Sequence, residues 1–175
     1  MRKPFIAGNW KMFKTCKEAA VFAEEFKKLY QPSDVTVAIC APFTQLAVLK
    51  EAFNGTGIKV GAQNMHFEES GAFTGEISAD MLTELGVDYC VIGHSERRQY
   101  FAETDETVNK KLHTAFRHEI LPILCVGEAL AQRDGGQALS VVESQVKGAL
   151  CGLTREQVVS WQSVIILKGR KCWAV

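Results

Sequence analysis

The sequence has no excess charge of either sign, because 20 basic and 20 acidic side chains balance to a formal net charge of zero. A chain without a basic field is not expected to bind nucleic acid or an anionic membrane surface. No apolar run approaches the roughly 18 residues that a membrane-spanning helix needs, and the apolar stretch that ends at Trp10 is too short for a secretion signal. We therefore expect a soluble chain without a targeting segment.

The cysteines lack every spacing that is typical of a metal site. They stand at positions 16, 40, 90, 125, 151 and 172, with no CxxC pair among them. Cys40, Cys90 and Cys125 lie inside apolar runs, where a free thiol behaves as a small buried hydrophobe. This pattern predicts reduced, structural cysteines and a cytoplasmic protein.

The chain alternates between apolar runs and helical patterns. Strands are predicted at 5–10, 35–40, 58–62, 88–92, 120–126 and 163–167. One predicted helix begins with a capping box, Thr15-x-x-Glu18, and carries a core-facing stripe of Ala19, Phe22, Ala23, Phe26 and Leu29. Four further helices are predicted: one capped by Thr44, one over 79–85, one from Ser95 and one from Thr104. A fifth carries Leu139, Val142, Val146 and Leu150 on one face, and a sixth follows a second capping box, Thr154-x-x-Gln157. Strands that alternate with helices at this spacing predict a parallel sheet with right-handed crossovers.

Two α/β architectures have this alternation, and the polar residues distinguish them. Neither GxGxxG nor GxxxxGK[ST] is present, so no motif favours a nucleotide-binding sheet. Polar residues instead follow several strands: Asn9 and Lys11, Gln63 and Asn64, His94 to Glu96, and Gly127 with Glu128. A doubly wound sheet gathers its site at one switch point, whereas a (β/α)8 barrel collects site residues from many strand ends. We therefore predict a barrel, here incomplete with about six of eight β/α units, as one partial domain over residues 1–175.

The polar segments also carry a resemblance. Residues 5–12 (Phe-Ile-Ala-Gly-Asn-Trp-Lys-Met), 61–64 (Gly-Ala-Gln-Asn), 71–78 (Gly-Ala-Phe-Thr-Gly-Glu-Ile-Ser), 91–98 (Val-Ile-Gly-His-Ser-Glu-Arg-Arg) and 125–128 (Cys-Val-Gly-Glu) resemble the triosephosphate isomerase family, in order along the chain. The resemblance implies a (β/α)8 enzyme of glycolysis and gluconeogenesis that interconverts dihydroxyacetone phosphate and glyceraldehyde 3-phosphate. It implies a small-molecule substrate and no cofactor or metal.

The resemblance assigns roles to four residues. His94 would be the neutral electrophile, with a helix starting near Ser95 consistent with its neutrality. Lys11 would stabilise the developing oxyanion and attract the dianionic substrate. Asn9 would orient Lys11 and contact the substrate, and Glu96 would be a partner of Lys11 rather than the base. On its own, a lysine at a strand end is usually solvated, so these roles depend on the surrounding motif.

Other conspicuous residues are expected to have structural roles. We interpret His66 as a loop residue, and His113 and His118 as members of one helical region whose spacing is poor for a metal. Arg97 and Arg98 are expected to form structural ion pairs, and Trp10 to pack in the core. The polar loop over 63–78 is too long for a simple connection. In the family it enters a partner subunit, so Met12, Phe73 and Thr74 are predicted contacts of a homodimer; the alternative is a mobile surface loop.

The sequence departs from the family pattern at its C-terminal end, from about residue 167. The family's sixth strand leads into a segment with the catalytic glutamate, and alignment on Trp173 places Arg170 at that position. No Asp or Glu follows Glu156. By this resemblance we also expect residues 1–175 to lack the family's lid, last two strands and phosphate-binding loops, and strands one and six to have unpaired edges. Two interpretations remain: a C-terminally truncated isomerase that is inactive alone, or a non-catalytic barrel fragment that needs a complementing piece or partner.

Overall fold

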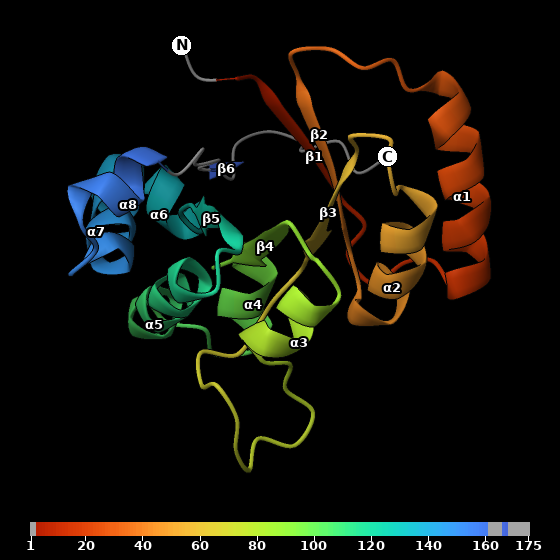
Figure 1. Cartoon of the computed structure of the whole chain (residues 1–175). Coiled ribbons are helices and arrows are strands. Elements are labelled where there is room, and N and C mark those ends of the chain that lie inside the picture. The colour runs from red at the N-terminus through yellow and green to blue at the C-terminus, as the bar shows by residue number, and fades with distance from the viewer. Residues whose placement is uncertain (1–2, 161–165, 168–175) are drawn as a thin grey trace.

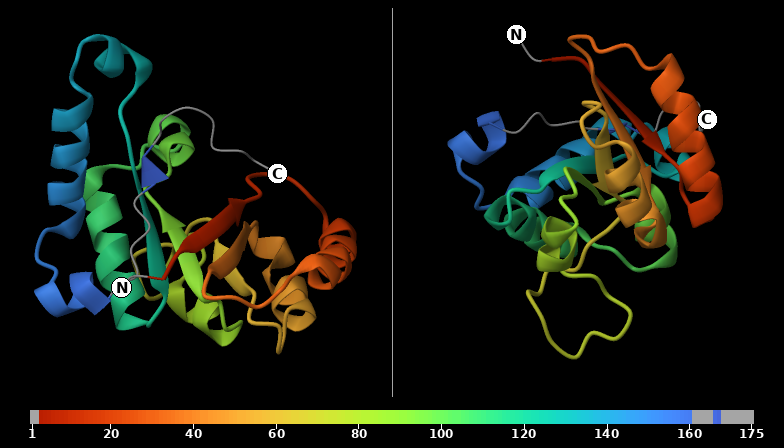
Figure 2. Two further views of the ribbon diagram at one scale, coloured as in Figure 1. Left: turned by 90° about the horizontal axis from the view of Figure 1, so that it is seen from above. Right: turned by 45° about the vertical axis from the view of Figure 1, so that its right-hand side comes forward.

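The computed structural model describes residues 3–160 and 166–167, and a curved parallel sheet lies at its centre (Figures 1 and 2). The strands are β1 (Phe5–Asn9), β2 (Thr36–Ala41), β3 (Lys59–Ala62), β4 (Tyr89–Ile92), β5 (Leu121–Val126) and β6 (Ile166–Leu167). They pair in parallel in the order β1-β2-β3-β4-β5-β6. Sequential parallel pairing with helical crossovers confirms the prediction of an incomplete (β/α) barrel. Within the described residues, β1 and β6 are the outer strands, each with one neighbour.

Helices connect these strands (Figure 2). They are α1 (Cys16–Leu29), α2 (Phe43–Ala52), α3 (Ala79–Glu84), α4 (Ser95–Tyr100), α5 (Asp105–Arg117), α6 (Leu130–Asp134), α7 (Ala138–Leu150) and α8 (Arg155–Ser160). Of these, α1, α2, α3, α5 and α7 contribute buried residues to the core on the outer side of the sheet. Thr15 caps α1 with the predicted reciprocal bonds to Glu18, and Thr104 caps α5. The Thr154–Gln157 pair also forms both of its predicted bonds.

Successive strand residues face two separate apolar clusters. The outer cluster, between sheet and helices, takes Ile39, Ala41, Cys90, Ile92, Leu124 and Val126 from the strands. The inner cluster, on the other face of the sheet, contains the alternate strand residues Ala38, Cys40, Tyr89, Val91, Ile123 and Cys125. Phe5 and Ala7 of β1 are partly buried and pack against this cluster. Burial on both faces explains why these strands are apolar runs without alternation. Gly61 faces inward without a side chain, and a Cβ there would lie 2.7 Å from the Cys40 sulfur.

Three details of the sequence prediction are wrong. Thr44 does not cap α2: the helix begins directly after Pro42, which occupies the N-cap position and makes no side-chain cap bond. Leu29 is exposed because it is the last residue of α1, where the chain turns away and Tyr30 continues the aromatic row from Phe26. Leu139 is exposed because it lies in the first turn of α7, ahead of the stripe that packs inward.

The predicted burial of Cys40, Cys90 and Cys125 is confirmed. Cys40, Cys90 and Cys125 are buried free thiols, whereas Cys16 and Cys151 are exposed free thiols. Cys172, and residues 163–165 of the predicted sixth strand, lie outside the described residues. None of the described helices is long and apolar enough to cross a membrane.

Candidate functional site

The ends of β1 and β4 bring together the residues that the sequence singled out. Lys11, two residues beyond β1, places its ammonium 2.7 Å from the Glu96 carboxylate in the first turn of α4. These two residues are 85 positions apart in the chain. Both side chains are partly exposed, so the ion pair lies at an open surface rather than in the core. Glu96 thus occupies the position expected for a partner of Lys11.

Lys11 has a left-handed backbone, with φ of 53°. Such a conformation costs a non-glycine residue about 1–3 kcal/mol and persists only where the surroundings enforce it. Here the Lys11 N–H donates to Asn9 Oδ1 at 2.9 Å, and the Gln63 amide donates to the Lys11 carbonyl at 2.9 Å. The same amide nitrogen lies 3.1 Å from Asn9 Oδ1 and 3.0 Å from the Cys40 carbonyl. Asn9 and Gln63 therefore fix the backbone from which the Lys11 side chain projects.

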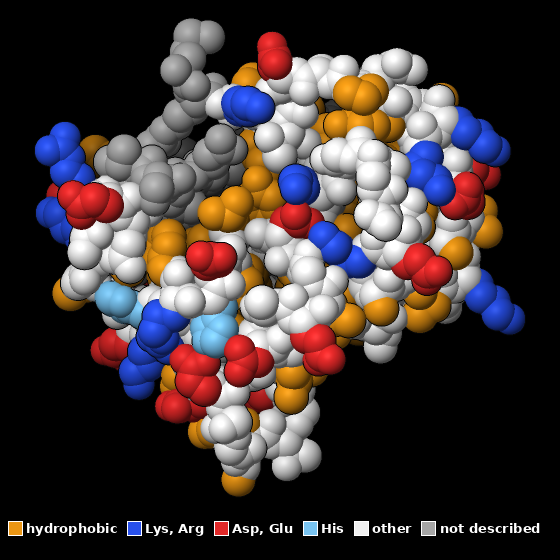
Figure 3. Space-filling view, in the orientation of Figure 1, with side chains coloured by type: hydrophobic (Ala, Val, Ile, Leu, Met, Phe, Trp, Pro, Cys, Tyr) orange, Lys and Arg blue, Asp and Glu red, His pale blue; other side chains and the backbone are white. Residues whose placement is uncertain are grey.

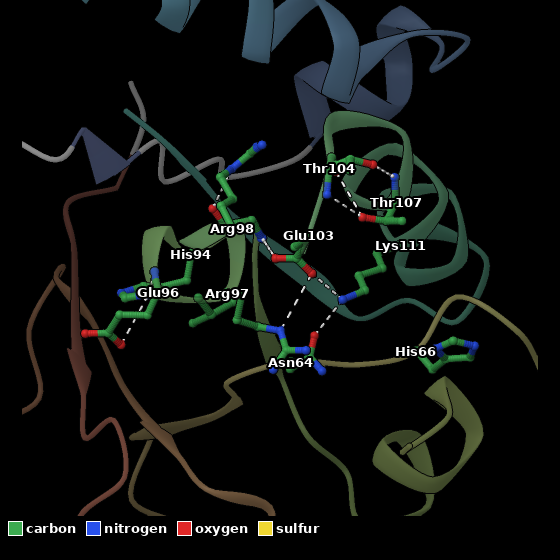
Figure 4. A network of polar contacts seen from close by, with 12 residues as sticks. Asn64, His66, His94, Glu96, Arg97, Arg98, Glu103, Thr104, Thr107 and Lys111 are labelled. Carbon is green, nitrogen blue, oxygen red and sulfur yellow. Dashed lines mark hydrogen bonds and ion pairs between the residues drawn. The ribbon is translucent and has the colours of Figure 1, made fainter. Parts of the chain in front are cut away.

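His94 is the N-cap residue of α4, and Gly93 separates it from the buried end of β4 (Figure 4). Its Nδ1 accepts the backbone N–H of Glu96 at 3.2 Å. A ring nitrogen that accepts a hydrogen bond carries no proton, so this contact fits the neutral ring, with its proton on Nε2, that the family resemblance implies. Glu96 Oε2 lies 3.5 Å from the same Nδ1, while Oε1 contacts Lys11. The Glu96 carboxylate therefore lies between the lysine and the imidazole.

The two arginines after Glu96 turn away from this surface and form ion pairs, as expected. Arg98 lies 2.6 Å from Asp105 at the start of α5, and Arg97 lies 3.7 Å from Glu103 and stacks over the Phe101 ring at 4.8 Å. The other histidines lie elsewhere: His66 in the long loop, His113 within α5 and His118 at its C-terminal end. No group of three or more His, Cys, Asp or Glu residues suited to a metal occurs in the described part of the chain.

The loop over 63–78 projects from the body of the molecule (Figures 1 and 3). The His66 N–H donates to the Ile77 carbonyl at 2.8 Å and closes its base. Inside it, the His66 ring packs against Phe67 and Phe73, each at 4.5 Å. The loop thus has internal contacts at its base and between its rings. Phe73 remains partly exposed, and Met12, beside Lys11, is 93% exposed.

Sequence reasoning missed Gln63 as a support of Lys11, and a buried network formed by Asn64, Glu103 and Lys111. Lys111 is buried on α5 and contacts both other members (Figure 4). A signal was present, because Lys111 directly precedes Leu112 on the apolar face of the predicted helix. A charged residue at the edge of such a face indicates a buried partner.

We compared the sequence and the structure of this chain with those of known proteins. A sequence model of the triosephosphate isomerase family matches residues 4–167. Triosephosphate isomerase of Clostridium beijerinckii is 51% identical over 175 residues, which cover all of this chain and 69% of that protein. The chain belongs to the triosephosphate isomerase family. Triosephosphate isomerase of Acetivibrio thermocellus is 58% identical over 157 residues, covering 90% of this chain and 62% of that protein.

The fold supports the same assignment. A crystal structure of triosephosphate isomerase from Bartonella henselae matches with a TM-score of 0.83 at 35% identity, covering 94% of this chain and 67% of that one. The matched residues 4–167 include Asn9, Lys11, His94 and Glu96. Arg170, which the sequence analysis predicts at the position of the family's catalytic base, lies outside the described residues.

Proposed function

We propose that this chain carries the electrophilic half of a triosephosphate isomerase site and that, as a 175-residue polypeptide, it lacks the base. The substrate is a triose phosphate, and the reaction is the interconversion of dihydroxyacetone phosphate and glyceraldehyde 3-phosphate. The observation that carries the proposal is the convergence of Lys11, His94 and Glu96 from the ends of two strands of a family barrel. We place the protein in the cytoplasm, as expected for a glycolytic enzyme.

The roles of the three groups follow from their protonation and position. Proton removal next to the substrate carbonyl develops negative charge on its oxygen, which the Lys11 ammonium and the Nε2–H of neutral His94 would stabilise. Both are donors, and neither takes a proton from carbon. Glu96 contacts Lys11 and lies beside His94, so it orients the cation and is already paired. Asn9 fixes the Lys11 backbone.

The proposed lack of a general base concerns the polypeptide of residues 1–175 and rests on the residues after Glu156. No carboxylate follows Glu156 in the sequence, and an arginine at position 170 cannot accept the proton because its guanidinium stays charged. Loss of a general base costs about 10²–10⁴ in rate. We therefore expect the 175-residue polypeptide to be inactive by itself.

The test is an isomerase assay on the purified 175-residue chain beside its His94→Gln variant. We expect equal rates, both indistinguishable from the no-enzyme background. A rate above background that His94→Gln abolishes would show that this chain has a working base, and would overturn the proposed inactivity while supporting the assigned reaction.

A second function is favoured by the open sheet. Within the described residues, β1 and β6 each have one neighbour, and unpaired edges recruit other strands. The alternative is a non-catalytic barrel fragment that needs a complementing piece or a partner. A defined oligomer in size-exclusion chromatography with one cooperative thermal transition supports it, whereas a cooperatively folded monomer contradicts it.

We also propose that the chain pairs with a second copy through Met12, Phe73 and Thr74, as the family resemblance implies. The support is the projecting loop with its internal packing and the exposure of Met12 beside the candidate site. Large exposed apolar side chains next to a projecting loop are typical of an interface. Sedimentation equilibrium of Met12→Glu beside the parent chain tests this, because a homodimer predicts dissociation of the variant only.

A further inference from the structure

Side chains bind both backbone polar groups of Gly93, the residue before His94. The Gly93 N–H donates to Glu103 Oε2 at 3.1 Å. The Gly93 carbonyl accepts from the Arg98 Nε at 3.0 Å. Arg98 is itself fixed by Asp105 at 2.6 Å. Two ion-pair systems therefore hold one residue at the point where β4 passes into α4.

The backbone of Gly93 is closely packed against β5 and α5. Its φ is +80°, and a Cβ there would lie 2.8 Å from the Cys125 carbonyl and 3.2 Å from Val108 Cγ2. A glycine is required both by the left-handed backbone and by the close approach of β5. The position of the His94 backbone therefore depends on the groups that bind Gly93.

Glu103 is the more deeply buried of these groups, because its side chain is only 2% exposed (Figure 4). Its other oxygen, Oε1, accepts from the ammonium of Lys111, a side chain that is 7% exposed. Lys111 also donates to Asn64 Oδ1 at 2.7 Å, and Arg97 lies 3.7 Å from Oε1. A buried carboxylate is stable only when such partners satisfy it. The network therefore fixes Glu103 and, with it, the acceptor for the Gly93 N–H.

We propose that Glu103 is a positioning residue for His94. It holds the Gly93 N–H, which sets the backbone of the N-cap residue and so the hydrogen bond from the Glu96 N–H to His94 Nδ1. That bond keeps the imidazole in the tautomer with its proton on Nε2. The importance of this role for catalysis rests on the proposed function, but the geometric effect on His94 does not.

The alternative is that Glu103 only stabilises the fold, through its ion pair with Lys111. Two double variants separate these possibilities. Glu103→Gln with Lys111→Met removes both charges but keeps a carbonyl acceptor for the Gly93 N–H. Glu103→Leu with Lys111→Met removes the charges and the acceptor. Replacing both members of a buried ion pair with neutral groups is tolerated better than removing one.

The readout is the ¹⁵N spectrum of the His94 imidazole in the full chain near pH 7.5, because ring shifts report which nitrogen carries the proton. We expect the parent chain and the Gln/Met variant to show one neutral tautomer with the proton on Nε2. We expect the Leu/Met variant to lose this pattern and to show averaged tautomers. Leu112→Ala, on the same helix, is the control for destabilisation alone and should keep the parent pattern.

Identical His94 spectra in the two double variants would overturn the proposal. Should the Leu/Met variant not fold, hydrogen exchange in the unmodified chain decides instead. The Gly93 amide should then exchange as slowly as the amides within β4, and exchange at the rate of an exposed amide would refute the role. Neither readout depends on isomerase activity, so failure of the proposed function leaves this test unaffected.

Discussion

The Asp88 carboxylate makes three favourable contacts at the amino end of the sheet. We expect its replacement by asparagine to lower the free energy of unfolding by an amount that depends on pH. Its Oδ2 accepts the Val60 N–H and the Lys50 ammonium, each at 3.0 Å. Its Oδ1 lies 3.0 Å from the Lys59 ammonium. The Asp88 side chain is only 18% exposed, so water cannot fully replace these contacts.

These contacts set the sign of the effect. Burial by itself raises the pKa of Asp88, but the hydrogen bond from the Val60 N–H and the two lysines outweigh it and hold the pKa below its ordinary value. A carboxyl whose pKa is lower in the folded state contributes stability above the unfolded pKa, at about pH 4 for aspartate. That contribution is lost as the pH falls through the lowered folded pKa.

The magnitude follows from the kind of contact. A hydrogen bond to a charged group contributes about 1.5–3 kcal/mol, and the exposure of both lysines reduces their share. The asparagine side chain would keep an acceptor for the Val60 N–H but would lack the charge. We expect Asp88→Asn to lower the free energy of unfolding by about 1–2 kcal/mol at pH 7, and by much less at pH 3.

Urea unfolding at the two pH values measures this difference. Asp34→Asn is the matched control, because Asp34 is exposed and has no ion pair within the described part of the chain, so its replacement should change stability little at either pH. An Asp88→Asn cost that is equal at pH 7 and pH 3 would refute the reasoning, since the loss would then come from packing rather than charge.

Three further predictions concern other parts of the chain. In the native state a thiol reagent should label exposed Cys16 and Cys151 and leave Cys40 unlabelled, because burial raises the pKa of the Cys40 thiol to about 12; mass spectrometry of the labelled peptides checks this. Gly93→Ala should cost at least about 2 kcal/mol in thermal or urea unfolding, because its methyl group meets the backbone of β5. Thr15→Ala removes the cap of α1 and should cost about 1 kcal/mol in the same assay, and a neutral effect would contradict the capping role.

The parts of the fold that follow from local rules could be predicted from the sequence. The Thr15–Glu18 box and the Thr104 cap act within one helical turn, and buried strands appear as apolar runs. Errors arose where tertiary position decides the outcome. Leu29 and Leu139 satisfy the helical period, but each lies in a terminal turn of its helix and is exposed.

The candidate site also has a part that the sequence predicts and a part that it does not. Its residues were found because they follow strands and match a family, yet their contacts join distant parts of the chain. The Gln63 amide supports Lys11 across 52 positions, and Lys111 reaches Asn64 across 47. No periodicity encodes such pairs, because they depend on which strand ends become neighbours in the barrel. The ion pair of Lys11 with Glu96 was expected only through resemblance to the family.

The central claim is that residues up to about 160 hold an intact half-site, which needs only the C-terminal part of a family barrel to become active. The most direct test is the isomerase rate of a chimera in which the segment after residue 160 comes from the Clostridium beijerinckii enzyme, whose sequence is 51% identical to this chain. We predict activity in the chimera, its loss in the His94→Gln chimera, and none in the 175-residue chain. A folded but inactive chimera, or an active unmodified chain, would contradict the account.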